Sequence, residues 1–320
     1  MSREEIRKAL IQGLGSWTSG QMLAESLKIS RAAVWKQVQS LRSEGYEIES
    51  SKRGYRLASL PDLLSEDLVK DGLKTEFVGR TVISHPSLAS TNAEAKRIAP
   101  PAENGTVVVA EVQTAGRGRM DRSWHSPKGG VWMSVILKPK IPPALASRVN
   151  MAAAVAVARA LEGLYDLDVR IKWPNDLLVG ERKICGILTE IEAEMDSLNY
   201  AVVGIGINAN IEAARLPEDW RATSISRELG RDVLRAELVQ RVLLEVERAS
   251  EEMTVSFDRV CREWMARSAT LGQRVRIITR IGEFEGRAEA LEADGALLVR
   301  KDDGTGERII AGDCTHLRPA

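Results

Sequence analysis

The apolar pattern of this 320-residue chain changes its period twice, and these changes limit what the chain can fold into. Residues 1–60 read as three short helices followed by a hairpin. Residues 75–269 combine apolar strand-like segments with long helices, and residues 270–320 read as short strands separated by glycine turns. The sequence therefore predicts an α+β protein with three domains, in which residues 61–74 form a linker.

The first domain has the layout of a winged helix-turn-helix. Ser30 is placed to cap a helix, because its hydroxyl can accept a free N–H group of the first turn. That helix begins at Arg31 and is expected to end at Gly45. The alternating residues around Lys52-Arg53-Gly54 then predict a β-hairpin, which would be the wing.

Basic residues on the third helix and on the wing predict that this domain binds DNA. Residues 1–60 contain ten Lys and Arg and six Asp and Glu, a net charge of +4, in a chain that is neutral overall. Cations attract phosphates, and Arg and Gln can read base edges in the major groove. A protein-interaction module with a solvated basic face is the alternative, and the joint basicity of helix and wing favours DNA. The predicted DNA-binding residues are Ser30, Arg31, Lys36, Gln37, Lys52 and Arg53.

The second domain is expected to contain a mixed or antiparallel sheet with helices on one face. Several apolar segments follow one another without a helix between them, which argues against a doubly wound sheet. The third domain has glycine turns at Gly282, Gly295 and Gly304 and is expected to be a small β-barrel. The strands predicted for the second domain are 106–112, 131–137, 169–173, 184–191 and 200–207, and the helices are 147–164 and 235–263.

Composition and spacing exclude several other classes of protein. The three cysteines (Cys185, Cys261 and Cys314) and the three histidines are far apart, so we predict neither a disulfide framework nor a metal site. The charged N-terminus lacks the apolar core of a signal peptide. The most apolar helix-like run, Met151 to Ala158, is too short to span a bilayer. A cytoplasmic protein without a membrane segment is therefore expected.

The segment 113–127, with the sequence QTAGRGRMDRSWHSP, predicts a mobile cationic loop. Its glycines leave the backbone free to approach a ligand closely. Its arginines repel one another unless an anion lies between them, so we expect the empty loop to be disordered and a phosphate-bearing ligand to order it. The residues concerned are Gly116, Arg117, Gly118, Arg119 and Arg122, with Trp124 as an aromatic anchor.

The segment 172–188 predicts the fixed part of a site. The proline of its WPND sequence restricts the preceding residue to an extended conformation. Asn175 and Asp176 are then expected at a turn, with side chains that can point into a cleft. Lys183 opens an apolar strand, where its ammonium group could neutralise a carboxylate and a phosphate at once. It could equally extend to solvent, and the spacing alone leaves both interpretations open.

Five segments together resemble the biotin–protein ligases. With a winged helix in front, the chain resembles the bifunctional type, which is both a biotin ligase and the biotin operon repressor. One departure is Met120-Asp121, where relatives often carry an additional Arg-Gly pair; Asp121 reduces the positive charge of the loop and predicts weaker retention of the intermediate. The segments are STNAEAK at 90–96, QTAGRGR at 113–119, KWPNDLLV at 172–179, RKICGIL at 182–188 and GIGIN at 204–208.

The resemblance implies a fold, a reaction and a set of cofactors. The catalytic domain would be similar to class II synthetases, and the C-terminal barrel would be SH3-like. Biotin and ATP, with Mg²⁺, would form biotinyl-5′-AMP and pyrophosphate. A lysine amine of a biotin carboxyl carrier protein would then attack the mixed anhydride.

The resemblance also implies roles for single residues. Arg119 and Lys183 would offset the negative charge of the biotin carboxylate and of the α-phosphate, because repulsion between these anions is part of the barrier. Asp176 would orient the incoming lysine or the Mg²⁺ shell. These three are the predicted catalytic residues. The predicted cofactor-binding residues are Ser90, Thr91, Asn92 and Gln113 around the biotin ring, Arg117 closing that pocket, Trp124 and Asn208 at the adenine, and Gly116, Gly118, Arg119, Lys183 and Gly186.

Finally, the resemblance implies a switch. The adenylate would order loops, ordered loops would favour a homodimer, and the dimer would present two winged helices to a two-fold operator. Three alternatives stay open: a ligase whose winged helix has no repressor role, a ligand sensor without enzymatic activity, and a lipoyl ligase. The intact Lys183 and Asp176 argue against the sensor, and the paired GRGR and KWPND segments argue against the lipoyl ligase.

Overall fold

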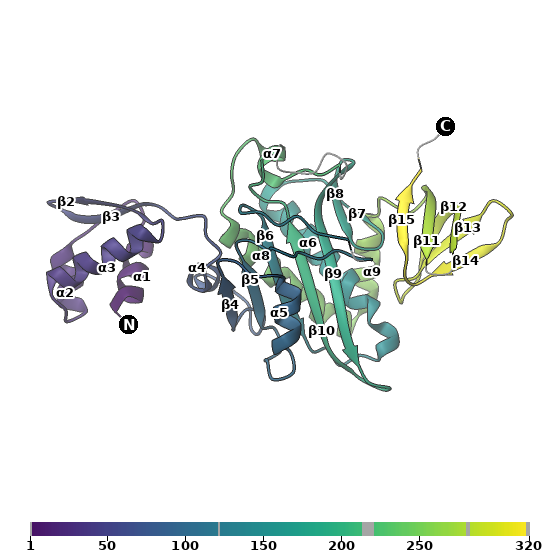
Figure 1. The fold of residues 1–320 in the computed structure, drawn as a ribbon, viewed down its shortest axis with the longest axis horizontal. Helices are drawn as coiled ribbons and strands as arrows, with labels where there is room; N and C mark the ends of the chain where they lie inside the picture. Colours follow the sequence, from purple (N-terminus) through teal and green to yellow (C-terminus); the bar gives the residue numbers. More distant parts are fainter. Residues whose placement is uncertain (1, 121, 213–220, 280–281, 318–320) are drawn as a thin grey trace. The chain divides into compact units, whose positions relative to one another are not determined.

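The computed structural model describes residues 2–120, 122–212, 221–279 and 282–317 (Figure 1). The chain forms two compact units, Met1–Asp62 and Leu63–Ala320. The first unit contains the predicted winged helix-turn-helix, and the second contains most of the predicted linker together with the predicted central and C-terminal domains.

The first unit is a winged helix-turn-helix, as predicted. Ser30 caps the third helix, because its Oγ accepts from the Ala33 N–H at 3.1 Å. The sheet order is β1-β3-β2, so the wing hairpin gains a third, two-residue strand that was not expected. The elements are α1 (Ser2–Gln12), β1 (Trp17–Thr18), α2 (Gly20–Ser26), α3 (Arg31–Ser43), β2 (Glu47–Ser51) and β3 (Gly54–Ser59).

Helix α3 is fixed on the first unit by one apolar face. Its Val34, Val38 and Leu41 are fully buried and pack in one cluster with Ile6 and Leu57. Burial on one side leaves the opposite side of the helix at the surface, which is the pattern of an amphipathic surface helix.

The second unit is built on a seven-stranded mixed sheet with the order β4-β5-β6-β10-β9-β8-β7. Strands β4 and β5 are parallel, and all other neighbours are antiparallel. The predicted mixed sheet is confirmed. The sequence did not predict β4 and β8, which are short and carry a polar residue at one end. The strands are β4 (Val82–His85), β5 (Val107–Ala110), β6 (Val131–Leu137), β7 (Val169–Lys172), β8 (Asp176–Val179), β9 (Arg182–Ala193) and β10 (Leu198–Ile207).

Helices cover both faces of this sheet (Figure 1). Helices α6, α8 and α9 pack on the face to which Val107 and Val109 contribute. Helix α5 lies on the other face, where Ala95 packs with Val108. The prediction of helices on one face is therefore wrong, because the short helix α5 carries too few apolar residues to be recognised from its sequence. The helices are α4 (Glu66–Lys70), α5 (Thr91–Ile98), the 3₁₀ turn η1 (Pro143–Leu145), α6 (Ser147–Tyr165), α7 (Ile225–Leu229), α8 (Arg235–Val255) and α9 (Phe257–Ala266).

Helix α6 is the core helix of the second unit. Together with η1 it spans Pro143–Tyr165, which by length and composition alone could cross a membrane. This apolar helical stretch is thus longer than the run 151–158, whose short length predicts no membrane segment. In the structure 61% of its apolar window is buried, and the helix packs against both the sheet and α8.

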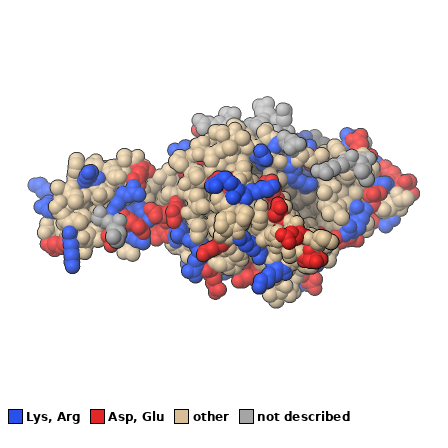
Figure 2. All heavy atoms as spheres, turned by 60° about the horizontal axis from the view of Figure 1, so that its bottom comes forward, with Lys and Arg blue, Asp and Glu red and all other residues tan. Residues whose placement is uncertain are grey.

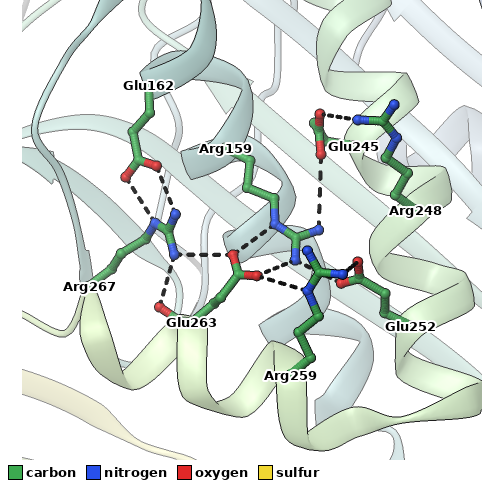
Figure 3. A network of polar contacts seen from close by, with 8 residues as sticks. All are labelled: Arg159, Glu162, Glu245, Arg248, Glu252, Arg259, Glu263 and Arg267. Carbon is green, nitrogen blue, oxygen red and sulfur yellow. Dashed lines mark hydrogen bonds and ion pairs between the residues drawn. The ribbon is translucent and has the colours of Figure 1, made fainter.

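An ion-pair network joins α6, α8 and α9 on the helical side of the second unit (Figure 3). Arg159 of α6 donates to Glu263 of α9 and to Glu252 of α8, each at 2.7 Å. Arg267 pairs with Glu162 at 2.8 Å. The hydrogen bond from Arg159 lowers the pKa of Glu263 to about 2, so this carboxylate stays ionised far below neutral pH. Further members of the network are Glu245, Arg248 and Arg259.

The chain ends in a five-stranded antiparallel sheet with the order β14-β13-β12-β11-β15, so the small β-domain is confirmed. It is joined to the central sheet: Trp173 N–H donates to Thr270 Oγ1 at 2.9 Å, and Thr270 Oγ1 lies 3.0 Å from His316 Nε2. Its Val275 and Val299 belong to the same apolar core as the central sheet. The strands are β11 (Arg274–Thr279), β12 (Gly282–Leu291), β13 (Leu297–Lys301), β14 (Gly306–Ile309) and β15 (Asp313–His316).

Candidate active site

A cavity of about 570 Å³ lies in the second unit. The start of α5, the loop 113–124, the β7–β8 turn, strands β9 and β10, and the start of β15 meet around it. Of the predicted catalytic and cofactor-binding residues, the lining contains Ser90, Thr91, Asn92, Gln113, Arg117, Gly118, Arg119, Trp124, Asp176, Lys183 and Gly186. The fold therefore brings together most of the residues that the sequence motifs singled out.

One end of the cavity is a neutral polar pocket at the start of α5. The Gln113 side-chain oxygen accepts from the Thr91 N–H at 2.8 Å, and its amide nitrogen donates to Ser126 at 2.8 Å. The Ser134 hydroxyl lies 2.8 Å from Thr91 Oγ1 and 2.6 Å from Asn92 Oδ1. Their mutual hydrogen bonds hold these side chains in place, which prepares the pocket for a ligand with its own donors and acceptors.

The other end of the cavity is cationic. Lys183 on β9 pairs with Asp176 on β8 at 2.6 Å, and its Nζ lies 4.8 Å from the centroid of the Trp124 ring. Lys183 therefore does not simply extend into solvent. The indole can approach because Gly186 and Gly206 have no side chain: a Cβ at Gly206 would lie 2.6 Å from Trp124 Nε1, and one at Gly186 3.0 Å from the ring. Over the visible face of this unit Lys and Arg are otherwise mixed with Asp and Glu (Figure 2).

The described residues of the arginine loop form a small hairpin at this end, with Arg117 opposite Ser123; that the empty loop is disordered stays a prediction. The Gly118 N–H donates to the Arg122 carbonyl at 2.7 Å. Arg119 Nη2 donates to the Gly312 carbonyl at 3.1 Å, and Arg122 forms an ion pair with Asp313. The C-terminal sheet thus supplies a carboxylate to one of the loop's arginines. Burial lowers the pKa of the Arg119 guanidinium, and the nearby Asp313 carboxylate opposes this shift.

Comparison with known families accounts for all three parts of the chain. Residues 84–208 match the biotin/lipoate A/B protein ligase family, residues 3–56 match a helix-turn-helix domain, and residues 270–317 match the biotin protein ligase C-terminal domain. The bifunctional ligase/repressor BirA of Bacillus subtilis (strain 168) is 42% identical over 97% of this chain and 98% of its own length. The chain belongs to the biotin protein ligase family.

More distant relatives agree with this membership. The bifunctional ligase/repressor BirA of Escherichia coli (strain K12) is 29% identical over 90% of this chain and 89% of its own length. The biotin protein ligase of Aquifex aeolicus, solved in complex with biotin and ATP, superimposes with a TM-score of 0.64 at 27% identity, over 75% of this chain and all of that chain. These matches confirm the predicted resemblance and the predicted fold class. They also confirm the predicted enzyme class, a biotin–protein ligase.

Two predicted residues do not line the ligase cavity. Asn208 is 3% exposed, and its amide donates to the Thr223 carbonyl at 3.0 Å. Gly116 is buried beneath the loop, where a Cβ would lie 2.3 Å from the Trp124 carbonyl oxygen. Arg117 lines the cavity although its side chain is exposed. Asp121, which distinguishes this loop, lies outside the described residues.

Several lining residues were not singled out from the sequence. They include Lys172 in the KWPND segment, Gly204 on β10, and Asp313, whereas Asn175, which was expected to face a cleft, does line the cavity. Lys172 and Gly204 lie within the family motifs, so their motif membership was the signal that could have found them. Asp313 lies nearly two hundred residues after the loop that it contacts, and no local pattern marks it.

The predicted DNA-binding residues lie on α3 and on the β2–β3 turn of the first unit. Arg31, Lys36, Lys52 and Arg53 are exposed, as contact with an anionic partner requires. Gln37 is half-buried. The Ser30 hydroxyl is exposed too, but it already accepts the capping hydrogen bond of α3.

Proposed function

We propose that the cavity joins biotin to AMP and passes the biotin to a protein lysine, and that the first unit represses transcription of biotin genes. One observation carries the enzymatic part: a neutral hydrogen-bonding pocket and a cationic group lie in the same cavity. Biotin fits this pairing, because its neutral ring needs hydroxyl and amide partners and its carboxylate needs cations. The match to a ligase that binds biotin and ATP supports it.

Biotin binds with its ureido ring in the polar pocket. Thr91, Asn92 and Gln113 are positioned to exchange hydrogen bonds with the ring, and Ser134 orients the first two. Ser90 acts through the helix, because its hydroxyl is directed at the first turn of α5. Arg117 and Gly118 close the pocket from the rim.

Lys183 and Arg119 promote the first step. A carboxylate oxygen of biotin attacks the α-phosphorus of ATP, and pyrophosphate leaves with the electron pair of the broken P–O bond. Two negatively charged groups must meet, so preorganised cations in the cavity lower the barrier. Asp176 holds the Lys183 ammonium group at 2.6 Å before substrate arrives.

Transfer needs no covalent bond to the enzyme. The amine of an acceptor lysine attacks the acyl carbon of biotinyl-5′-AMP, and AMP leaves. Asp176 orients this amine, since its carboxylate faces the cavity. The acceptor is a biotin carboxyl carrier protein.

Mg²⁺ accompanies ATP. The described residues contain no cluster of three or more His, Cys, Asp or Glu side chains that could hold a metal. The carboxylate of Asp176 nevertheless lines the cavity. Mg²⁺ is commonly held by one or two carboxylates together with substrate phosphates, so this donor set fits. Bound there, it would neutralise phosphate charge.

Trp124 provides the apolar surface for the adenine. Its ring is already held between Lys183 and Trp132, whose ring centroid lies 6.4 Å away in an edge-on arrangement. Asn208 supports this part of the site from behind, through the Thr223 carbonyl.

The first unit binds a two-fold operator when biotinyl-AMP has induced a homodimer, in the cytoplasm. Exposed cations on α3 and the wing support DNA contact, and the match over nearly the whole length of bifunctional ligase/repressors favours this over a ligase without a repressor role. The proposed domain boundaries are 1–60, a linker 61–74, 75–269 and 270–320.

Three measurements test the proposal. Purified protein should release pyrophosphate only with both biotin and ATP, and should transfer radiolabelled biotin to a carrier domain. Footprinting of a biotin-gene promoter should show protection that needs biotin and ATP. If no pyrophosphate is released, the protein is a ligand sensor without enzymatic activity. If the promoter shows no ligand-dependent protection, the protein is a ligase without a repressor role.

A further inference from the structure

Trp35 on helix α3 is a large aromatic residue at the surface of the first unit. Its side chain is 57% accessible, whereas its neighbour Val34 is fully buried. A large aromatic side chain contributes most to stability when it is buried, and here the apolar core is formed without it. Trp is among the residue types that contribute most to binding contacts when they lie at a surface.

The polar atom of this indole is committed within the protein. With the Gln39 amide oriented to suit its neighbours, its oxygen accepts from Trp35 Nε1 at 3.3 Å and from Arg42 Nη1 at 3.0 Å. Arg42 in turn donates to the Ile48 carbonyl and, at 2.8 Å, to the Ser50 hydroxyl on β2. This chain of hydrogen bonds fixes the ring relative to the wing. What remains for a partner is the apolar part of the ring.

The residues around Trp35 indicate that this partner is DNA. Arg31 lies one turn earlier on α3, Lys36 is the next residue, and both are exposed. Exposed Lys52 and Arg53 form the wing turn of the same unit. An apolar group flanked by cations matches the major groove, where phosphates border the base edges and thymine presents a methyl group.

Resting on the proposed DNA binding, we propose that Trp35 is a specificity residue that reads thymine C5-methyl groups in the operator. The cations hold the helix on the phosphates of any sequence, whereas the indole ring discriminates among sequences. Its fixed N–H group makes it a reader of methyl groups rather than of hydrogen-bonding edges.

The test uses the full-length protein with biotin and ATP and a pool of random duplexes of about 40 base pairs, long enough for two half-sites one or two turns apart. Each thymine of the selected duplex is then replaced by deoxyuridine, which removes only the methyl group. Wild type should lose about four-fold in affinity at one or two positions of each half-site, the fold change expected for one buried methyl group. Trp35→Ala should bind the thymine duplex more weakly and lose this discrimination, and Trp35→Phe should keep it.

Met22→Ala is the matched control, because Met22 is a similarly exposed apolar residue, 66% accessible, on α2. It should discriminate as wild type does. If Trp35→Ala discriminates as well as wild type, or if wild type ignores every methyl group, the role of Trp35 is overturned while DNA binding stands. If no duplex is selected at all, DNA binding itself fails, and the role of Trp35 fails with it.

Discussion

Two charged clusters of the second unit use the same kinds of side chain to different ends. In the helical network Arg159 is paired with Glu252 and Glu263, and its side chain is only 12% exposed (Figure 3). In the cavity, the cations of Lys183 and Arg119 border open space, and their carboxylate neighbours come from β8 and from the C-terminal sheet.

This difference indicates that the helical network contributes to stability and that the cavity cations contribute to activity. Where each charge is matched by a protein charge, the attraction holds helices together and leaves nothing for a ligand. Where cations face a cavity with few carboxylates, an incoming phosphate completes the pairing. Breaking the helical network should therefore reduce the free energy of unfolding, and changing the cavity should reduce turnover with little effect on folding.

Lys183→Ala should have the largest effect. Loss of its charge should slow adenylate formation by about 10² to 10³-fold, the range for removing one group that stabilises a developing charge. Arg182→Ala is the control, because Arg182 is adjacent but pairs with Glu228 at 3.0 Å. The measurement is pyrophosphate release together with thermal unfolding. Near-normal release by Lys183→Ala would remove its assigned role.

Arg159→Met should reduce the free energy of unfolding by about 2–4 kcal/mol, because it removes the least exposed cation of the network and leaves Glu252 and Glu263 with longer pairs to other arginines. Urea unfolding measures this. Arg248→Met removes an ion pair with Glu245 in which the Arg248 side chain is 54% exposed. It should reduce the free energy of unfolding by less than about 1 kcal/mol. Both variants should adenylate normally while folded, and equal stability losses would contradict the idea of a specific network.

Arg119→Gly should release the adenylate about ten-fold faster, because the loop would lose both a cation and its hydrogen bond to the Gly312 carbonyl. Free biotinyl-AMP during turnover is the quantity to measure. Unchanged retention would show that the loop closes without this side chain.

Asp313→Asn should have a smaller effect, about three-fold on adenylate release, since it weakens only the ion pair that holds Arg122. The loop and the C-terminal sheet should act as a pair: Asp313→Asn combined with Arg122→Gln should release no faster than either alone. If the two substitutions have additive effects on adenylate release, Asp313 and Arg122 act independently and not as a pair.

The pH dependence of stability should show a comparably small effect. Burial lowers the pKa of His316 to about 4 from its ordinary 6.5. The unfolded chain therefore binds a proton below pH 6.5, whereas the folded chain accepts it only near pH 4. The contribution of His316 to the free energy of unfolding is thus fully present above pH 6.5 and is lost as the pH falls from 6.5 to 4. For this half-buried side chain we expect about 1 kcal/mol. His316→Gln should flatten that part of the profile of melting temperature against pH; an unchanged slope would assign it to other groups.

The sequence by itself determined the local elements and the identity of most cavity residues. Ser30 before an apolar helix, and the glycine at the wing turn, specify α3 and the hairpin through local hydrogen bonds and backbone freedom. The continuous apolar runs of β6 and β10 predict central strands. The motifs also place Lys183 near Asp176, because both lie on one hairpin.

Only the tertiary structure decided which distant groups meet. The contact of Arg122 with Asp313, the position of α5 on the second face of the sheet, and the burial of Asn208 away from the cavity depend on packing between segments far apart in the chain. Such contacts form because the shared apolar core fixes the sheets relative to one another. The residues near Arg122 and Asn208 in the sequence do not specify that core, so neither the carboxylate that pairs with Arg122 nor the hydrogen bond of Asn208 could be predicted from them.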